Sequence, residues 1–220
     1  GKTGTPLVLN TDTSWKTQRS PITPLGPLQS HHYGGERYDS RLDRSDWAST
    51  TLDDKDWGNA LIYEPSTPLI AAQVSEPNRI LGDIPARSVQ RQDDGTWLVD
   101  MGKNFTGWLE CRFPEGAIEG AEVRFEYGDK VLSNGELQTN NQYDEYVFNG
   151  PTAQAFQSRF NYHAFRWVHI KGLENALRPE DIIGHWISTD YAPASEFTSS
   201  DELLNQIYNT ANWTYRCLTL

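Results

Sequence analysis

Carboxylate side chains are the groups in this chain that most directly suggest chemistry. Glu126 and Asp100 both lie in strand-like segments. Hydrolysis of a sugar bond needs two carboxyl groups, about 5–5.5 Å apart for retention or about 6.5–9.5 Å apart for inversion. In the segment AEVRFEYGD, however, Glu126 alternates with apolar residues and falls on the face opposite the aromatic side chains. We therefore expect a solvated sheet face here rather than a catalytic pair.

Three further aspartates could bind a cation. Asp53, Asp54 and Asp56 offer the oxygen ligands that Ca²⁺ prefers. Their spacing is not that of an EF-hand loop, and LDDKDW is typical of an Asx-type turn followed by a buried Trp57. A turn is the favoured interpretation, and a calcium site is the alternative.

The histidines give no familiar metal spacing. His31 and His32 lie in an expected loop, whereas His163, His169 and His185 lie in strand-like runs. Three converging imidazoles could hold a metal, but structural histidines are more common. The sequence has no C-x-x-C, H-E-x-x-H or G-x-S-x-G motif, and its opening GKTGT lacks the upstream part of a phosphate-binding loop. We predict no catalytic, cofactor-binding or metal-binding residue in this chain.

Tryptophan is abundant, with eight residues in the chain. Flat aromatic rings can stack on sugars, so an independent carbohydrate-binding module is an alternative function. Four tryptophans lie within expected strands, where a core position is favoured: Trp97, Trp108, Trp167 and Trp186. Trp47 and Trp57 follow acidic turns, and their positions stay open.

Charge and composition exclude several classes of partner. The chain has 220 residues, a net charge of −11 and an isoelectric point near 4.8. Nucleic acids and anionic membranes attract clustered Lys and Arg, so we expect neither as a partner. No stretch approaches the roughly 20 apolar residues of a membrane helix. The chain begins with Gly rather than Met, which suggests trimming, so the lack of a signal peptide says nothing about export.

The two cysteines are too few for a disulfide framework. Cys111 lies in a strand-like run with Leu109 and Phe113, so we expect it to face the core as a small hydrophobic residue. A bridge between Cys111 and Cys217 is not expected.

Alternating hydrophobicity predicts an all-β fold. Val123, Phe125 and Tyr127 share one face of an antiparallel strand. Similar segments recur along the chain, and LSNGEL carries an Asn-Gly turn signal. They are TWLVDMG, GWLECRF, DEYVFNG, FQSRFNYH, FRWVHIKG and IIGHWIS. The proline-rich SPITPLGPLQS is expected to be an edge or linker segment, and a second proline-marked stretch, 63–87, is expected to hold a domain boundary.

The end of the chain has a different periodicity. Ser199 and Glu202 fit a capping box, which predicts a helix start. Apolar residues then recur at helical spacing, and they are Leu203, Leu204, Ile207, Tyr208, Ala211 and Tyr215. The sandwich is therefore expected to end near residue 192.

The order of several motifs resembles bacterial α-L-rhamnosidases. The quoted segments are VDMGKNFTGWLECRF, GAEVRFEYGDKVLSNGELQTNNQYDEYVFNG and FNYHAFRWVHIKGL. The matching positions are Asp100, Gly102, Asn104, Gly107, Trp108, Gly135, Leu137, Asp144, Tyr146, Gly150, Phe160, Tyr162, His163, Phe165, Arg166, Val168 and Gly172. The resemblance runs from about Thr11 to the last residue.

This resemblance implies an antiparallel β-sandwich of the jelly-roll or concanavalin-like type with a C-terminal helix. It implies a linker and the tail of a jelly-roll-like module at 1–68, an accessory sandwich at 69–192, and the start of a helical catalytic domain at 193–220. Family members cleave terminal α-L-rhamnose with inversion, and their acid and base lie in a helical barrel that would begin after Leu220.

The resemblance also sets the expected role. The favoured hypothesis is an accessory part, inactive alone, that braces the catalytic domain of an enzyme acting on rhamnosylated glycans outside the bacterial cytoplasm. A catalytic sandwich, as in some jelly-roll lyases, is a further alternative. The terminal helix would face absent partner helices, and in this chain it could fray, fold back or pair with another copy.

Overall fold

A computed structural model describes residues 8–27, 29–30, 32–63 and 71–220. The chain divides into two compact units. The first combines Gly1–Ser20 with Asp43–Gln73, and the second combines Pro21–Leu42 with Val74–Leu220. The expected division at residues 68 and 192 stays a prediction.

The first unit contains a short two-stranded ladder. Its strands β1 (Lys16–Thr17) and β4 (Gly58–Asn59) pair antiparallel. Before β4, the Asp53 carboxylate accepts a hydrogen bond from the Lys55 backbone N–H, as expected for an Asx turn. Trp57 is half-buried rather than buried, which corrects the expectation for this residue.

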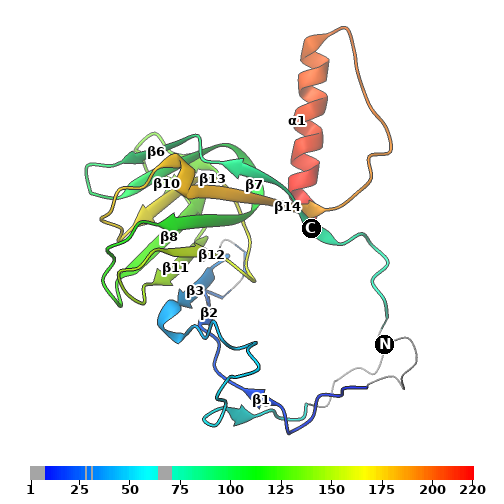
Figure 1. Ribbon diagram of the computed structural model, residues 1–220. Coiled ribbons are helices and arrows are strands. Elements are labelled where there is room, and N and C mark those ends of the chain that lie inside the picture. Colours follow the sequence, from blue (N-terminus) through cyan, green and yellow to red (C-terminus); the bar gives the residue numbers. More distant parts are fainter. Residues whose placement is uncertain (1–7, 28, 31, 64–70) are drawn as a thin grey trace. The chain divides into compact units, whose positions relative to one another are not determined.

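The second unit is built on a ten-stranded sheet that curls into a sandwich (Figure 1). Its strands run in the order β2-β3-β11-β8-β13-β7-β14-β5, and β6 and β12 also pair with β7. Their bounds are β2 Ile22–Leu25, β3 Gly35–Asp39, β5 Asn78–Pro85, β6 Ser88–Arg91, β7 Trp97–Phe113, β8 Glu122–Gly128, β11 Tyr143–Val147, β12 Gln154–Gln157, β13 His163–Lys171 and β14 Ile182–Thr189. Strands β3 and β11 are parallel, and the other pairs of this sheet are antiparallel. The expected all-β sandwich with a C-terminal helix is confirmed.

Short elements complete this unit. The 3-10 helices η1 (Ser40–Leu42) and η2 (Pro179–Asp181) lie between strands. Strands β9 (Lys130–Val131) and β10 (Leu137–Gln138) form the hairpin expected around LSNGEL. Strand β2 pairs only with β3 among the described strands, so Ile22–Leu25 of the proline-rich segment form an edge strand. Strand β5 lies inside the stretch 63–87, which also contains the change from the first compact unit to the second after Gln73.

Strand β7 joins the two layers of the sandwich. It has 17 residues, pairing with β6 and β13 near its start and with β12 and β14 near its end. TWLVDMG and GWLECRF, expected as separate strands, therefore belong to one. Gly107 lets β14 approach closely, since a Cβ there would collide with the carbonyl oxygen of His185.

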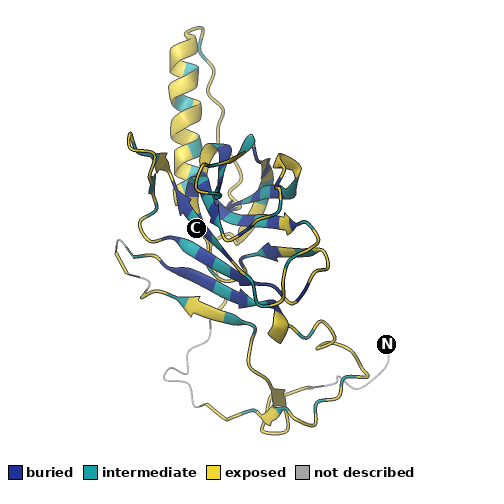
Figure 2. Cartoon of the chain, turned by 90° about the vertical axis from the view of Figure 1, so that its left-hand side faces the viewer, coloured by how far each residue is buried: buried dark blue, intermediate teal, exposed yellow. Residues whose placement is uncertain are grey.

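Large aromatic rings dominate the core between the layers. The buried residues lie mainly on the strands of the sandwich (Figure 2). Val123, Phe125 and Tyr127 are fully buried, which confirms the face expected for β8. Phe113 lies 5.0 Å from Tyr146, measured between ring centroids. Cys111 is buried, as expected, and both cysteines are free.

A bulge in β13 changes which tryptophans are buried. The register shifts between Phe165 and Trp167, so Phe165 and Val168 are both fully buried. Trp167 consequently lies on the outer face, half-buried, and so does Trp108 in β7. The core positions expected for these two residues are wrong, whereas Trp97 and Trp186 are buried as expected.

The helix α1 (Glu202–Leu218) forms where its periodicity predicts it. Its N-cap is Asp201, whose carboxylate accepts hydrogen bonds from the backbone N–H groups of Leu203 and Leu204. The expected capping box at Ser199 is therefore wrong by two residues. Ser199 instead exchanges two hydrogen bonds with the side-chain amide of Asn205.

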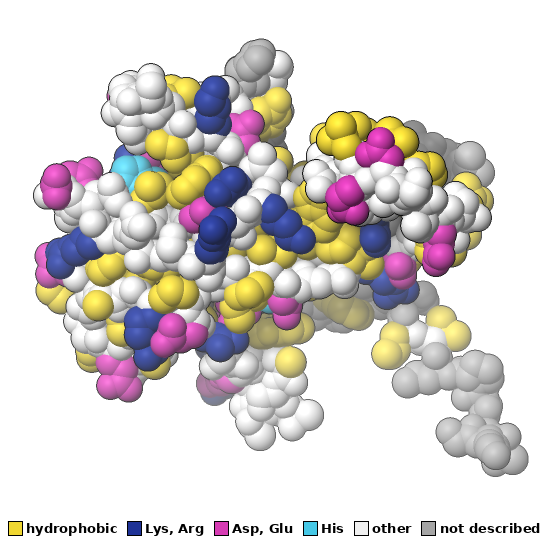
Figure 3. Space-filling model, turned by 90° about the horizontal axis from the view of Figure 1, so that it is seen from above, with side chains coloured by type: hydrophobic (Ala, Val, Ile, Leu, Met, Phe, Trp, Pro, Cys, Tyr) yellow, Lys and Arg dark blue, Asp and Glu magenta, His cyan; other side chains and the backbone are white. Residues whose placement is uncertain are grey.

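The apolar stripe of α1 is exposed, as Figures 2 and 3 show. Ile207 is 55% exposed, and Leu203, Leu204 and Tyr215 are similarly open. Within the described part of the chain, no helix is long and apolar enough to cross a membrane.

Candidate functional site

The two carboxylates considered for catalysis, Asp100 and Glu126, are held by different cations. Arg166 donates two hydrogen bonds to Asp100, of 2.8 Å and 3.0 Å, and these lower the pKa of Asp100. Glu126 forms ion pairs with Lys171 at 2.8 Å and Arg124 at 3.0 Å. Burial opposes ionisation of Glu126, but the two cations outweigh it and its pKa is also lowered. A general acid needs a raised pKa, so this pair is unsuited to protonate a leaving group.

The histidines of the strands do not converge. His163 bonds to Asp144, His169 to Thr96, and His185 to both Asp83 and Glu110. Among the described residues, no group of three or more His, Cys, Asp or Glu side chains could hold a metal ion.

Asp144 is the centre of a buried polar network. Its side chain is fully buried and accepts hydrogen bonds from the Glu36 backbone N–H at 2.8 Å, Tyr127 at 2.8 Å and Ser158 at 2.5 Å. The His163 ring contacts the same carboxylate at 3.0 Å. Burial, the largest effect, raises the pKa of Asp144, but His163 and the hydrogen bonds together lower it below the ordinary value.

Glu36 extends this network to the loop before β13. Its buried carboxylate accepts hydrogen bonds from the backbone N–H groups of Arg159, Phe160 and Asn161, at 2.7 Å, 3.0 Å and 3.3 Å. Three donors on one carboxylate fix the path of this loop. Sequence analysis missed the role of Glu36, because nothing local marks a buried acid in a strand.

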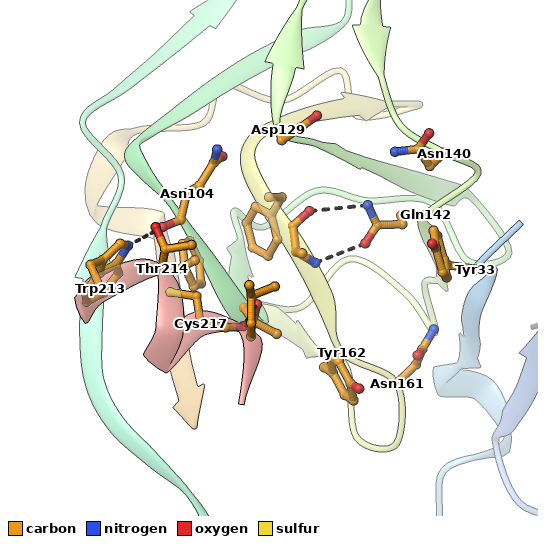
Figure 4. A pocket seen from close by; sticks show the side chains of 15 residues that line it. Tyr33, Asn104, Asp129, Asn140, Gln142, Asn161, Tyr162, Trp213, Thr214 and Cys217 are labelled. Carbon is orange, nitrogen blue, oxygen red and sulfur yellow. Dashed lines mark hydrogen bonds between the residues drawn. The ribbon is translucent and has the colours of Figure 1, made fainter. Parts of the chain in front are cut away.

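A cavity of about 630 Å³ opens beside the C-terminal part of α1 (Figure 4). Its size is within the range of about 300–1,000 Å³ that is typical of small-molecule pockets. It is lined by Tyr33, Asn104, Phe105, Thr106, Asp129, Asn140, Gln142, Asn161, Tyr162, Ala164, Phe165, Trp213, Thr214, Cys217 and Leu218. Apolar side chains thus meet amides and one carboxylate.

The helix side of the cavity is fixed by Trp213. The Trp213 ring packs 4.6 Å from that of Trp186, and the Lys103 ammonium lies 3.7 Å from its centroid. Its indole N–H donates a 2.7 Å hydrogen bond to the Asn104 carbonyl (Figure 4). Thr106 donates a further one, of 2.6 Å, to the Cys217 carbonyl.

The sheet side of the cavity is fixed by Gln142. Its side-chain amide both accepts from and donates to the backbone of Ala164 in β13, as Figure 4 shows. The adjoining Asn140 has a left-handed backbone, with φ of 51°. Sequence analysis did not identify Tyr33, Asn140, Tyr162 or Trp213 as neighbours, because they come together only through the sheet order.

Most of the chain matches two domain families, and both occur in α-L-rhamnosidases. Residues 2–82 match the α-L-rhamnosidase N-terminal domain, and residues 90–188 match the bacterial α-L-rhamnosidase concanavalin-like domain. The chain belongs to the bacterial α-L-rhamnosidase family. This confirms the resemblance inferred from the motifs.

Curated and solved α-L-rhamnosidases are similar to this chain over nearly its whole length. One from Formosa agariphila is 30% identical over 97% of this chain and 23% of that protein. The structure of α-L-rhamnosidase from Dictyoglumus thermophilum superposes with a TM-score of 0.85 at 30% identity, covering 95% of this chain and 24% of that one. The Streptomyces avermitilis enzyme complexed with L-rhamnose gives a TM-score of 0.82 at 26% identity, covering 95% and 20%.

The alignments cover nearly all of this chain but less than a quarter of each curated relative. This α-L-rhamnosidase family member spans 21–23% of the lengths of its curated relatives. The activity that those proteins are named for is therefore a proposal for this chain.

Proposed function

We propose that this chain is the accessory β-sandwich part of an α-L-rhamnosidase that cleaves terminal α-L-rhamnose from glycosides. Its role is to support a separate helical catalytic domain, and alone it is inactive. The main support is the match of both accessory domain types, in order, to relatives named as α-L-rhamnosidases. We also propose that the whole protein acts outside the bacterial cytoplasm.

The exposed stripe of α1 supports a docking role toward the catalytic domain. Ile207 and its apolar neighbours are open to solvent on a helix that begins with a well-formed cap. A helix with one apolar face gains most of its stability by packing that face against a partner. The catalytic domain is the proposed partner for this face.

Hydrolysis by a longer protein tests the proposal. We expect no release of the aryl group from an aryl α-L-rhamnoside by the 220-residue chain, and release by a version extended past Leu220 with the sequence that its gene encodes there. Circular dichroism must show that both proteins are folded. A folded extended protein that is inert on α-rhamnosides would refute the assignment.

A substitution in the stripe tests the docking role. Ile207→Asp places a charge on the apolar face and should lower the melting temperature of the extended protein more than that of the short chain. Asn209→Asp is the matched control, because it adds the same charge at an exposed polar position of α1. Equal effects of Ile207→Asp on both proteins would contradict docking through this face.

A further inference from the structure

An asparagine followed by a glycine occurs twice in this chain. Asn134 precedes Gly135 between β9 and β10, and Asn149 precedes Gly150 between β11 and β12. Asparagine is chemically labile, and a following glycine has no Cβ to hinder attack on its side chain. We propose that the fold protects Asn134 and leaves Asn149 reactive, so that Asn149 is a site of spontaneous deamidation.

The chemistry of the modification sets what a reactive site must have. The backbone nitrogen of the glycine loses its proton and attacks the side-chain carbonyl carbon of the asparagine, and a cyclic succinimide forms as the amide nitrogen leaves as ammonia. Water then opens the ring at either carbonyl and gives aspartate or isoaspartate. Water is thus consumed, ammonia is released, and nothing is oxidised or reduced. A reactive pair needs a glycine N–H that is free and an asparagine amide that can move.

The turn between β9 and β10 meets neither condition. The Gly135 N–H donates a 2.9 Å hydrogen bond to the Leu132 carbonyl, so attack by this nitrogen requires that bond to break. The Asn134 side chain is held at both of its polar atoms by Glu136. Its Oδ1 accepts from the Glu136 backbone N–H at 3.1 Å, and its Nδ2 donates to the Glu136 carboxylate at 2.9 Å. Asn134 is therefore protected although it is exposed to solvent.

The turn between β11 and β12 meets both conditions. Among the described residues, none accepts a hydrogen bond from the Gly150 N–H. The Asn149 side chain is exposed, and its nitrogen donates only a long hydrogen bond, of 3.4 Å, to the Ser40 carbonyl within the described structure. A Cβ built at Gly150 would meet no atom within 4 Å, so there is room for the ring to form.

Gln154 makes the structural consequence of the reaction specific. Its Oε1 accepts from the Asn149 backbone N–H at 3.2 Å and from the Tyr146 hydroxyl at 2.9 Å. Its Nε2 donates to the Gly150 carbonyl at 2.7 Å. These bonds hold the chain on both sides of the reacting peptide and leave the Gly150 N–H free. Isoaspartate in place of Asn149 adds a carbon to the backbone between the two anchored groups, so conversion should weaken the connection from β11 to β12.

Incubation of the 220-residue chain at mildly alkaline pH tests the selectivity. Peptide mass spectrometry should show conversion at Asn149 faster than at Asn134 by about tenfold or more, because the turn at Asn134 must first break its hydrogen bonds. In guanidinium chloride the two pairs have no fold to distinguish them, and they should convert at similar rates. The readout involves no glycoside, so its result does not affect the proposed hydrolase assignment.

Substitutions separate the two turns. Asn149→Gln should remove most of the ammonia released by the folded chain, and Asn134→Gln is the matched control that should leave the release unchanged. Glu136→Ala removes one of the bonds that hold Asn134 and should speed conversion there without affecting Asn149. Aged wild type should also have a lower melting temperature than aged Asn149→Gln. Circular dichroism must show that each fresh variant is folded.

Three outcomes would overturn the inference. They are conversion at Asn134 as fast as at Asn149 in the folded chain, an Asn149 that stays intact in the folded chain while the denatured chain converts, and ammonia release that Asn149→Gln does not reduce. Equal melting temperatures of aged wild type and aged Asn149→Gln, with Asn149 converted, would overturn the consequence assigned to Gln154.

Discussion

At the scale of single residues, buried and exposed carboxylates have different consequences for stability. Asp144 is fully buried with four partners, whereas Asp190 is about half exposed and pairs with Arg79. Removing one member of a buried charged network costs far more than removing a surface ion pair, because the remaining groups stay buried without a partner.

Replacement of Asp144 tests this difference. We expect Asp144→Asn to lower the free energy of unfolding by about 3 kcal/mol, measured by urea denaturation. Asp190→Asn is the control and should cost less than about 1 kcal/mol. Similar costs for the two variants would show that the network contributes little.

The lowered pKa of Asp144 also predicts how the stability of wild type and of Asp144→Asn depends on pH. The pKa of Asp144 is lower in the folded chain than its ordinary value, so its contribution is fully present above about pH 4 and is lost as the pH falls through the folded pKa. Wild-type stability should therefore decrease in acid more steeply than that of Asp144→Asn. Parallel pH profiles for the two proteins would contradict the assigned role.

The bulge in β13 predicts unequal costs for two neighbouring aromatic residues. Phe165 is fully buried, and Phe165→Ala should cost about 3–5 kcal/mol. Trp167 is half-buried on the outer face, so Trp167→Ala should cost about 1–2 kcal/mol. Melting temperatures of both variants check the order, and a larger loss for Trp167→Ala would place its ring in the core.

At the scale of elements, α1 is tied to the sandwich at one end. Trp213 contacts Trp186, Lys103 and the Asn104 carbonyl, and the Thr219 carbonyl accepts from the Thr189 N–H at the end of β14. The exposed stripe begins at Leu203 near the free end of the helix and continues as far as Tyr215. The contacts therefore lie near the C-terminal end of α1, where they form one wall of the cavity.

Loss of Trp213 should release the helix and leave the sheet intact. In Trp213→Ala, amide hydrogen exchange in α1 should become faster while exchange in β7 and β13 stays slow, because helices of this length are marginal without packing. Leu204→Ala is the control, since Leu204 lies on the exposed stripe. Unchanged exchange in α1 of Trp213→Ala would show that other contacts hold the helix.

At the scale of the whole molecule, the buried hydrophobic core is formed almost entirely by residues that precede α1. From α1, Trp213 and Cys217 pack against the core as partly buried residues, and the other hydrophobic residues of the core cluster lie before it. The sandwich of the second unit thus has its own buried interior, and α1 adds a contact at its surface.

A truncation after Asp190 tests this independence. The shortened chain should keep the near-ultraviolet circular dichroism of a packed aromatic core and unfold cooperatively, with a loss of about 1–3 kcal/mol for the missing Trp213 contact. A chain ended after Asp181 is the control and should not fold, because it lacks β14 between β7 and β5. An unfolded product from the first truncation would make α1 part of the core.

Local sequence patterns determined much of this structure. The alternation in β8 predicted its buried face, the helical spacing after residue 200 predicted α1, and the order of motifs identified the family. These features depend on neighbours in the chain, so a single sequence contains them. The N-cap was missed by two residues, because Ser199 and Asp201 are both good capping residues and only the backbone path selects one.

Tertiary structure decided the rest. The bulge that turns Trp167 outward depends on how β13 pairs with β7, and periodicity within one segment cannot report the register between two strands. The cavity joins Tyr33, Asn140, Tyr162 and Trp213, which are far apart in sequence and meet only because β3, β11, β13 and α1 are placed by the sheet and the helix contacts. Glu36 is buried for the same reason, since its three backbone partners lie 123 to 125 residues away along the chain. Long-range pairing is a property of the whole fold, so the chain's local patterns indicate its elements but not the site that those elements form.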